Sequence, residues 1–375
     1  MRRMANLEVK KHMSAWQLAI VVFVTCIGAQ IMLTPRGLIA QVKNGAWISV
    51  LLGGMFFYTA TYFMLRLGKQ YPDETIVEYA PKIFGRIGGG IVIFWFNLLF
   101  YMQVITIFYG VGRIITFYMF DRTPPEVVIL ALLVVCTYCA LQDWGTILRI
   151  QQFLFVIAYS ILILVWLTSI LNFQPENMLP LWPLDIKGVA LGSFTTWGMY
   201  SGYECVLLLL PLVYRKVSLS KLAKTVGLAF VGLSIVFMLI IILTIGVLTV
   251  EDAKNVPFPS LIVIRSVELP GTFLERLENY LLVTWIPVVF DTLAAMMFFM
   301  AEVCMRRCRH ADHRPALLIL VPIIYVGAML IENPQIDEVL GKFTMWLGLT
   351  FSFGVVPMAL LLTWWQKRKV GKECG

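Results

Sequence analysis

From Thr25 to Pro35 the chain reads Thr-Cys-Ile-Gly-Ala-Gln-Ile-Met-Leu-Thr-Pro, inside an apolar run that begins at Ser14 and continues past Leu38. Glycine weakens a helix, and a break in mid-membrane frees backbone groups that hydrocarbon cannot satisfy. Such a break survives where it faces a cavity or a ligand. We therefore interpret this run as a discontinuous helix beside a binding site. The alternative is a continuous helix that uses Gly28 for close packing against a neighbour.

A second interrupted run extends from Gly192 to Glu204 and reads Gly-Ser-Phe-Thr-Thr-Trp-Gly-Met-Tyr-Ser-Gly-Tyr-Glu. Gly198 and Gly202 lie four residues apart in it, with Ser201 between them. The interrupted runs are the first and sixth of ten apolar runs, so they occupy the same place in each half of the chain. Five spans per half give the halves opposite orientations, and interruptions at matching places in inverted halves indicate a transporter-type site. Two unrelated clusters of packing glycines are the alternative.

The composition is that of an integral membrane protein. Of 375 residues, 59% are hydrophobic and 14% are charged, with a mean hydropathy of +0.82, whereas soluble domains carry about 25% charged residues. The predicted fold class is all-α, a single polytopic membrane domain over residues 1–375, with a first repeat over about 14–171 and a second over about 187–366. Since a span needs about 20 apolar residues, the predicted spans are 14–38, 46–66, 89–120, 125–141, 146–171, 187–213, 225–249, 273–304, 315–331 and 341–366.

Basic residues collect in alternate loops. If the N-terminus is inside, the inner segments hold 21 of the 30 lysine and arginine residues, as expected for cytoplasmic loops. Both termini are therefore predicted to be cytoplasmic, and the net charge of +8 reflects membrane orientation rather than nucleic-acid binding. The seven cysteines lie in spans or in predicted cytoplasmic loops, which argues against a disulfide framework.

The interrupted runs have the chemistry to bind a zwitterion. Exposed N–H groups at the start of a half-helix favour a carboxylate, while free carbonyls and Glu204 favour an ammonium group or a cation. Glu204 has a second interpretation, because Ser201-x-x-Glu204 is also a capping box for the second half-helix. Asp291 in the eighth span is a further ionisable group at depth. It binds a cation or a proton, or it pairs with a nearby donor, and the sequence leaves these alternatives open.

Two connections are predicted to be structured. Residues 71–85 mix apolar and charged side chains, which is typical of a short interfacial helix on the inner face. Residues 251–272 surround the apolar piece Leu261-Ile-Val-Ile264 with prolines. An apolar piece in an external loop must bury itself, either as a lid over a cavity or as a docked loop. Ser14-x-x-Gln17 predicts a capping box at the start of the first span.

No enzyme is predicted, because the sequence contains neither a Walker lysine loop nor a nucleophile elbow. Cys304, Cys308, His310 and His313 have spacings that allow a zinc site, but they follow a span in a basic loop. Neither a metal nor another cofactor is therefore predicted.

In the order of its motifs the chain resembles the spore-germination permease family, the GerAB-like B subunits of germinant receptors, which belong to the amino acid/polyamine/organocation superfamily. The resemblance runs nearly end to end, and each motif is weak by itself. The motifs are Ile27-Gly28 with Leu33-Thr-Pro-Arg36, Asn44-Gly-Ala-Trp-Ile-Ser-Val50, Tyr71-Pro-Asp-Glu-Thr-Ile-Val-Glu-Tyr79, Leu179-Pro-Leu181, Gly202-Tyr-Glu204, Pro259-Ser-Leu261, Phe273-Leu-Glu-Arg-Leu277, Trp285 and Arg314-Pro315.

The resemblance implies a fold of the LeuT type with helices 1 and 6 broken, a place in the spore inner membrane, and two partners: a membrane-embedded A subunit and a lipoprotein C subunit. It also implies recognition of an amino acid, a sugar or a nucleoside as germinant. Two features depart from the family, the Thr195-Thr-Trp197 sequence where a proline is common and the presence of Asp291. The implied ligand-facing residues are Thr25, Cys26, Ile27, Gly28 and Ala29; Thr196, Gly198, Met199, Tyr200, Ser201, Gly202 and Glu204; and Tyr101 and Thr292.

Three functions compete at this point. The first is a receptor subunit in which ligand binding, most simply of an amino acid, shifts the bundle between two states and triggers the partner subunits. The second is a proton- or cation-coupled amino acid transporter in which Glu204 or Asp291 carries the coupled charge. The third is an ion- or water-conducting scaffold that binds no small molecule.

Overall fold

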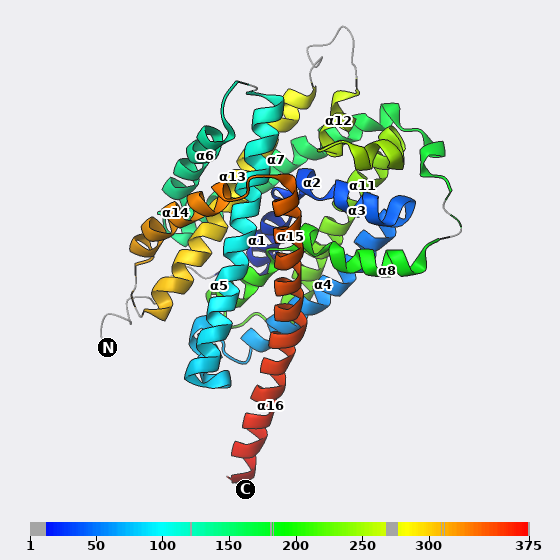
Figure 1. The fold of residues 1–375 in the computed structure, drawn as a ribbon. Coiled ribbons are helices and arrows are strands. Elements are labelled where there is room, and N and C mark those ends of the chain that lie inside the picture. Colours follow the sequence, from blue (N-terminus) through cyan, green and yellow to red (C-terminus); the bar gives the residue numbers. More distant parts are fainter. Residues whose placement is uncertain are drawn as a thin grey trace.

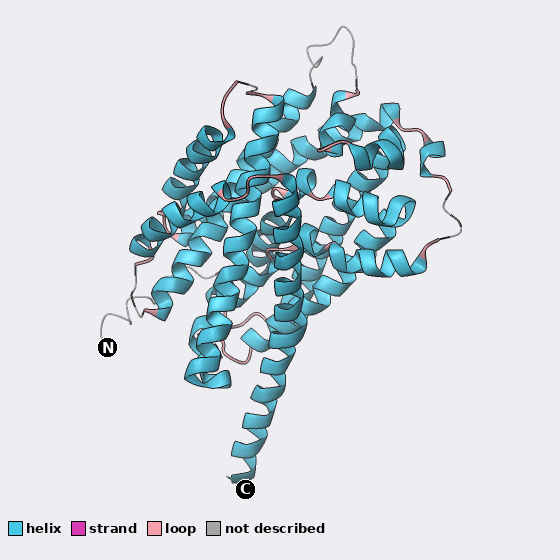
Figure 2. Cartoon of the chain, viewed as in Figure 1, coloured by secondary structure: helices cyan, strands magenta, loops and turns pink. Residues whose placement is uncertain are grey.

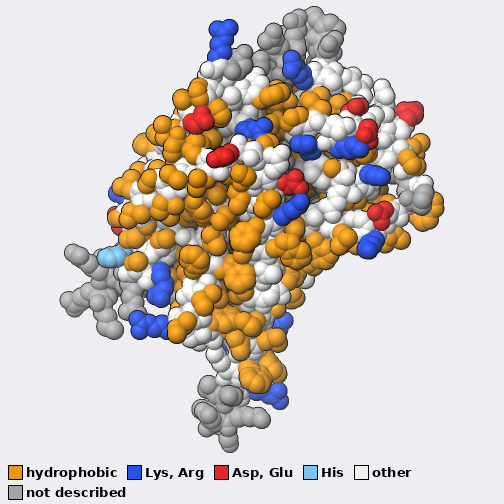
Figure 3. Space-filling model, viewed as in Figure 1, with side chains coloured by type: hydrophobic (Ala, Val, Ile, Leu, Met, Phe, Trp, Pro, Cys, Tyr) orange, Lys and Arg blue, Asp and Glu red, His pale blue; other side chains and the backbone are white. Residues whose placement is uncertain are grey.

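The computed structural model describes residues 13–120, 122–180, 182, 184–267, 277–308, 310 and 312–373. Apart from one isolated bridge, the regular structure in this part of the chain is helical (Figures 1 and 2). Seven stretches of the described residues are long and apolar enough to cross a membrane, and three shorter apolar helices accompany them. Hydrophobic side chains cover a broad area of the face shown in Figure 3. The chain is therefore a multi-pass helical membrane protein.

Helices lie over each of the predicted spans. In the first half they are α1 (Ala15–Ile27), α2 (Gln30–Leu33), α3 (Pro35–Val42), the turn η2 (Lys43–Gly45), α4 (Ala46–Gly68), α5 (Ile76–Tyr118), α6 (Pro125–Ala140), α7 (Trp144–Thr168), and the turns η3 (Ser169–Asn172) and η4 (Pro175–Met178).

In the second half they are α8 (Ile186–Thr195), α9 (Trp197–Tyr200), η5 (Tyr203–Cys205), α10 (Val206–Leu209), η6 (Leu210–Leu212), α11 (Leu219–Asn255), α12 (Pro259–Arg265), α13 (Leu277–Arg307), α14 (Arg314–Met329), α15 (Pro334–Thr350), the π-turn η7 (Phe351–Val355) and α16 (Val356–Glu373).

Local sequence explains where the helices start. The predicted capping box at α1 is confirmed, because the Gln17 N–H donates to Ser14 Oγ at 3.2 Å and the Ser14 N–H donates to Gln17 Oε1 at 2.8 Å. A second capping box joins Thr75 to Glu78 at the start of α5. This helix bends at Gly85, where φ is +76°. The part before the bend, residues 76–84, is the short helix predicted for this connection.

α1 lies at the centre of the bundle (Figure 1). Its buried residues point in every direction around the helix axis, among them Leu18, Val21, Val22 and Val24, as expected for a helix that is apolar all round. It packs against α7, α11 and α13. The first interrupted run therefore lies among other helices, where protein rather than lipid can satisfy its backbone.

The ends of the two interrupted runs are tied together by backbone hydrogen bonds. The Met13 N–H donates to Leu212 O at 2.6 Å, and the Tyr214 N–H donates to Met13 O at 3.1 Å. The start of α1 is thus joined to the chain that follows η6. The first run also contacts the second at α9, η5 and α10, whereas α8 packs against α3 and α4.

Candidate functional site at the interrupted helices

The first interruption lies at Gly28 and Ala29. α1 ends at Ile27, Gly28 has φ −15° and ψ −97°, and α2 starts at Gln30. The Gly28 N–H still donates to Val24 O at 3.3 Å. Its carbonyl turns toward α13 and accepts from Nε1 of Trp285 at 3.1 Å. Because Trp285 is 0% exposed, it satisfies inside the protein a carbonyl that hydrocarbon would leave unpaired.

The close approach of α13 explains why residue 28 is glycine. A Cβ at this position would lie 2.1 Å from Oγ1 and 2.7 Å from Cβ of Thr292. The Thr292 hydroxyl lies within hydrogen-bond distance of Val24 O (3.2 Å) and Val288 O (3.1 Å). Close packing, which the sequence offered as the alternative role of Gly28, therefore occurs at the same residue as the change in backbone direction.

Replacing Trp285 with Phe should destabilise this interruption. Most of the ring packing is kept, but the Gly28 carbonyl loses its donor, and a buried unsatisfied acceptor costs about 1–3 kcal/mol. We expect the free energy of unfolding in detergent to fall by that amount. Trp16→Phe is the matched control, because Trp16 is 55% exposed and lies on α1, the helix that ends at the first interruption. Equal losses in both variants would contradict the role given to Trp285.

The second interruption lies at Ser201 and Gly202, between α9 and η5. Ser201 has φ −58° and ψ 144°, and Gly202 has φ +111°, a left-handed conformation that favours glycine. A Cβ on Gly202 would lie 2.9 Å from the carbonyl oxygen of Thr25 and 2.9 Å from its Cγ2. The two interrupted runs therefore touch where Gly202 meets Thr25. Both the dihedral angle and the available space require glycine at this contact.

Glu204 is the charged residue of this contact region and is 0% exposed. Its Oε2 accepts from the Gly202 N–H at 2.8 Å. Its Oε1 accepts no well-formed hydrogen bond from the described residues. The indole N–H of Trp197 acts on this carboxylate as a hydrogen-bond donor, but the contact does not have the geometry of a full hydrogen bond at either Nε1 or Oε1. A donor and an acceptor thus meet in the interior beside the second interruption and satisfy each other only in part.

The capping box predicted at Ser201 is wrong. The Ser201 hydroxyl donates to Gly198 O at 3.0 Å, and the Ser201 N–H is already bonded to Trp197 O at 2.7 Å. Because α9 uses that N–H for its last turn, Glu204 caps the next N–H along the chain, that of Gly202.

Comparisons with known proteins identify the family. A family model described as "Spore germination protein" matches residues 12–336. The chain belongs to this family. Among its relatives, spore germination protein YndE of Bacillus subtilis is 28% identical over 362 residues, covering 94% of this chain and 96% of YndE. Spore germination protein B2 of the same organism is 22% identical over 358 residues, covering 95% and 96% of the two chains.

A solved structure supports the fold of this spore germination family member. A sodium-coupled sialic acid symporter in a substrate-bound outward-open state superposes with a TM-score of 0.64. The superposition covers 92% of this chain and 80% of the symporter, at 10% sequence identity. At that identity the likeness concerns the fold alone, which is of the LeuT type.

The remaining residues predicted from the germination family lie in three environments. Cys26, Ile27, Ala29 and Met199 are buried beside the interruptions. Thr25 and Thr196 bond their hydroxyls to carbonyls of their own helices, Val21 O and Ser193 O, each at 2.7 Å. Gly198 faces the junction of α2 and α3, because a Cβ there would lie 3.5 Å from Thr34 Cγ2.

The two tyrosines predicted for the site point to other helices. Tyr200 donates to Val50 O of α4 at 2.9 Å and shares a hydrogen bond of 2.8 Å with Ser234 of α11. Tyr101 donates to Ile323 O of α14 at 3.3 Å. Its hydroxyl also occupies the space that a Cβ on Gly327 would need. The structure thus brings together Gly28, Thr292, Thr25, Gly202 and Glu204, but it directs Tyr101 to α14.

Asp291, the second predicted coupling residue, lies on α13 and is 0% exposed. Neither of its carboxylate oxygens has a hydrogen-bond partner among the described residues. Cys136 and Cys139 of α6 and Tyr159 of α7 lie near it. A carboxyl group placed at this depth without a partner is a candidate for binding a proton or a cation. The alternative that it pairs with a protein donor has no support in the described residues.

The apolar piece of the connection over residues 251–272 is buried, as predicted. It forms α12, in which Leu261, Val263 and Ile264 are 0% exposed. Ser260 Oγ donates to Ile31 O of α2 at 3.2 Å, so α12 covers the helix that follows the first interruption. Residues 268–276 of this connection, including most of the predicted Phe273 motif, lie outside the described residues.

Sequence reasoning missed two contacts of the site. Trp285 was noted only as a family motif, although its indole N–H binds the Gly28 carbonyl. Tyr203 shares a hydrogen bond of 2.7 Å with Ser352 of η7. The sequence Phe351-Ser-Phe-Gly-Val355, which forms this π-turn, was the available signal.

A pocket of about 380 Å³ lies apart from the site. Lys43, Glu176 and Thr249 are among its lining residues, and none of the predicted site residues lines it.

Proposed function

We propose that this protein is the membrane subunit of a spore germinant receptor, and that it binds a small germinant, most simply an amino acid, between the two interruptions. Its finer architecture is then ten transmembrane helices in a single domain, a 5+5 inverted repeat with helices 1 and 6 broken. Its place is the spore inner membrane, with both termini in the cytoplasm. Binding shifts the bundle between two states, and an A subunit and a lipoprotein C subunit receive the signal.

One observation supports the placement of the ligand. Oε1 of Glu204 and Nε1 of Trp197 are both buried beside Gly202 and make only an incomplete hydrogen bond with each other. A ligand whose polar groups pair with both atoms completes these hydrogen bonds, and a buried polar atom left unpaired costs about 1–3 kcal/mol. An ammonium group suits the carboxylate oxygen and a ligand acceptor suits the indole N–H. An amino acid supplies both.

Replacing Glu204 with Gln tests this placement. Gln keeps an oxygen to accept from the Gly202 N–H, so the local backbone should persist. Oε1 is replaced by an NH2 group, which repels an ammonium donor. We expect affinity for an amino acid germinant to fall about tenfold to a hundredfold, because hydrogen bonds to charged groups contribute about 1.5–3 kcal/mol.

The measurement is a binding titration on full-length protein in nanodiscs, after a screen of amino acids, sugars and nucleosides has found the germinant. Tyr101→Phe is the control within the predicted set, because its hydroxyl bonds α14. If Glu204→Gln binds the amino acid as tightly as the native chain, the ligand does not meet this carboxylate.

A proton- or cation-coupled transporter is the second candidate, and Asp291 favours it. Two buried carboxylates with unpaired oxygens, Glu204 and Asp291, lie in one bundle, and such groups mark proton and ion pathways. Reconstituted vesicles separate the candidates. Saturable, pH-dependent uptake of a labelled amino acid that Asp291→Asn abolishes would favour the transporter, and binding without uptake would favour the receptor.

A further inference from the structure

Residues 71–84 form a strap across the end of the bundle opposite α12 (Figure 1). The strap joins α4 to the main part of α5 and contains the short helix of residues 76–84. Its apolar side faces the bundle, where Ile76, Val77, Ala80 and Ile83 are buried. Tyr71 and Tyr79 stack with ring centroids 5.0 Å apart, which closes the strap on itself.

The strap is fastened to three separate elements. Asp73 pairs with Arg215 at 2.6 Å, in the chain that follows η6. Tyr71 shares a hydrogen bond of 3.3 Å with Thr363, and Ile83 O accepts from Gln366 at 3.5 Å, both on α16. The third fastening, to α13, is ionic.

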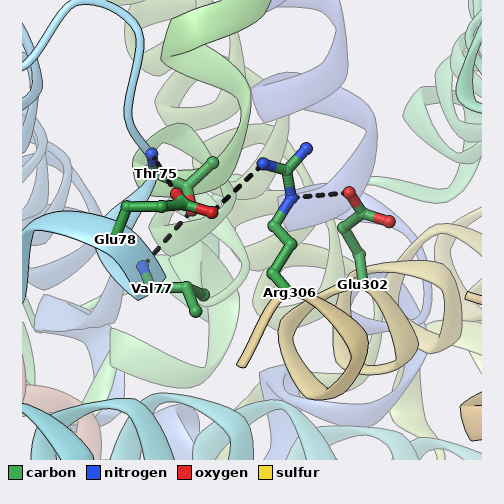
Figure 4. Close-up of polar contacts among 5 residues, drawn as sticks. All are labelled: Thr75, Val77, Glu78, Glu302 and Arg306. Carbon is green, nitrogen blue, oxygen red and sulfur yellow. Dashed lines mark hydrogen bonds and ion pairs between the residues drawn. The ribbon is translucent and has the colours of Figure 1, made fainter. Parts of the chain in front are cut away.

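That ionic fastening is the least exposed of the strap's charge contacts with other elements. Figure 4 shows Arg306 of α13 between two carboxylates. Its Nη1 lies 3.3 Å from Glu78 of the strap, and its Nε lies 2.6 Å from Glu302, one turn earlier on α13. Arg306 is 30% exposed, against 74% for Arg215. Arg215 makes two contacts with Asp73, at 2.6 and 3.0 Å, but both residues are exposed and salt screens them. The Glu78–Arg306 contact is single and longer, and it is the better shielded of the two.

The strap also has a hinge. Gly85, where it meets the rest of α5, has φ +76° and ψ 175°. No atom lies within 4 Å of where its Cβ would stand, so glycine is required by the dihedral angle and not by space. Beyond the bend the strap lies against the spanning part of α5, since a Cβ on Gly89 would stand 2.4 Å from Pro81 Cα. Rotation of residues 71–84 about Gly85 therefore has to open that contact as well.

We propose that residues 71–84 are a latch that closes this end of the bundle, with Arg306 as its catch and Gly85 as its hinge. The latch holds together α13, which supplies Trp285 and Thr292 to the first interruption, and the chain that follows the second interruption. Its release lets these elements move apart. The idea that germinant binding controls the latch rests on the proposed function. The idea that the latch closes this end of the bundle does not depend on it.

The closing contact can be tested without any ligand. Hydrogen exchange of the peptide covering residues 72–84 is measured on full-length protein in nanodiscs. Glu78→Gln removes the charge that Arg306 holds, while Gln still serves a capping box at Thr75. We expect exchange to become faster by about fivefold or more. Arg306→Lys should accelerate it as well, because Lys lacks the planar fork that reaches two carboxylates at once.

Glu74→Gln is the matched control. Glu74 pairs with Lys82, and both residues belong to the strap, so its loss removes a charge without unfastening the strap. Its exchange should stay at the native rate, and the double variant Glu78→Gln/Arg306→Lys should exchange no faster than the faster single variant. Unchanged exchange in Glu78→Gln, or equal acceleration in Glu74→Gln, would overturn the latch.

Germinant binding is titrated in the same preparations, so that the two proposals fail separately. Glu78→Gln should bind germinant at least as tightly as the native chain. If no germinant binds any variant but exchange follows the expected pattern, the latch stands and the ligand site fails. If germinant binds at Glu204 and exchange is unchanged in Glu78→Gln, the ligand site stands and the latch fails.

Discussion

Gly202→Val should abolish germinant binding while the protein stays folded in the membrane. Gly202 has φ +111°, and a β-branched residue in this region is strained by about 1–3 kcal/mol. Its Cβ would also stand 2.9 Å from Thr25 O, and forced overlap adds about 1–3 kcal/mol. Together these costs push the two interrupted runs apart. An affinity at least about a hundredfold weaker is the expected result.

Gly198→Ala is the matched control for this variant. Gly198 is the other glycine of the second run, yet its Cβ would meet only Thr34 Cγ2, at 3.5 Å. That distance is ordinary contact, so binding should change less than about threefold, within the usual range for neutral substitutions. The measurement is germinant titration, with size-exclusion chromatography to show that both variants fold. Native affinity in Gly202→Val would remove the second interruption from the site.

The sequence predicted those parts of this site that depend on neighbours along the chain. Gly28 and Gly202 were singled out because a glycine in mid-span is a local signal, and the backbone leaves the helical range at both. The Ser14–Gln17 capping box and the burial of residues 261–264 were predicted for the same reason. The length of the apolar runs predicted a helical membrane protein, and the order of the motifs predicted the family.

Contacts between residues far apart in the sequence could not be predicted from such local signals. Trp285 and Gly28 are 257 residues apart, and Arg306 and Glu78 are 228 apart, so each pairing depends on how helices are arranged. The direction in which a side chain points from its helix also depends on how the helices are arranged. Tyr101 was expected at the site, but the rotation of α5 turns it toward Ile323 of α14. The predicted capping box at Ser201 was wrong because Glu204 accepts from the N–H of Gly202, one residue later than expected. A pattern of residue types does not reveal such a shift.

The strongest effect at the first interruption is expected from Gly28→Leu. A Cβ at residue 28 would stand 2.1 Å from Thr292 Oγ1 and 2.7 Å from Thr292 Cβ, and a leucine adds three further carbon atoms in the same space. Because Thr292 is itself 1% exposed, it cannot move aside. α1 and α13 must therefore separate, which breaks the hydrogen bond from Trp285 to the Gly28 carbonyl. We expect no measurable germinant response in spores that carry this variant.

Two comparisons show whether that loss comes from the contact with α13. Gly37→Leu places the same side chain on α3, where no atom lies within 4 Å of the Cβ position, so the response should remain native. Gly28→Ala should weaken germinant binding about tenfold or more, since overpacking costs about 1–3 kcal/mol. Adding Thr292→Ala removes Oγ1 and Cγ2 of Thr292 and should restore part of the binding. A normal response from Gly28→Leu would mean that the germinant does not bind at this interruption, because no ligand could bind unchanged where the two helices have been forced apart.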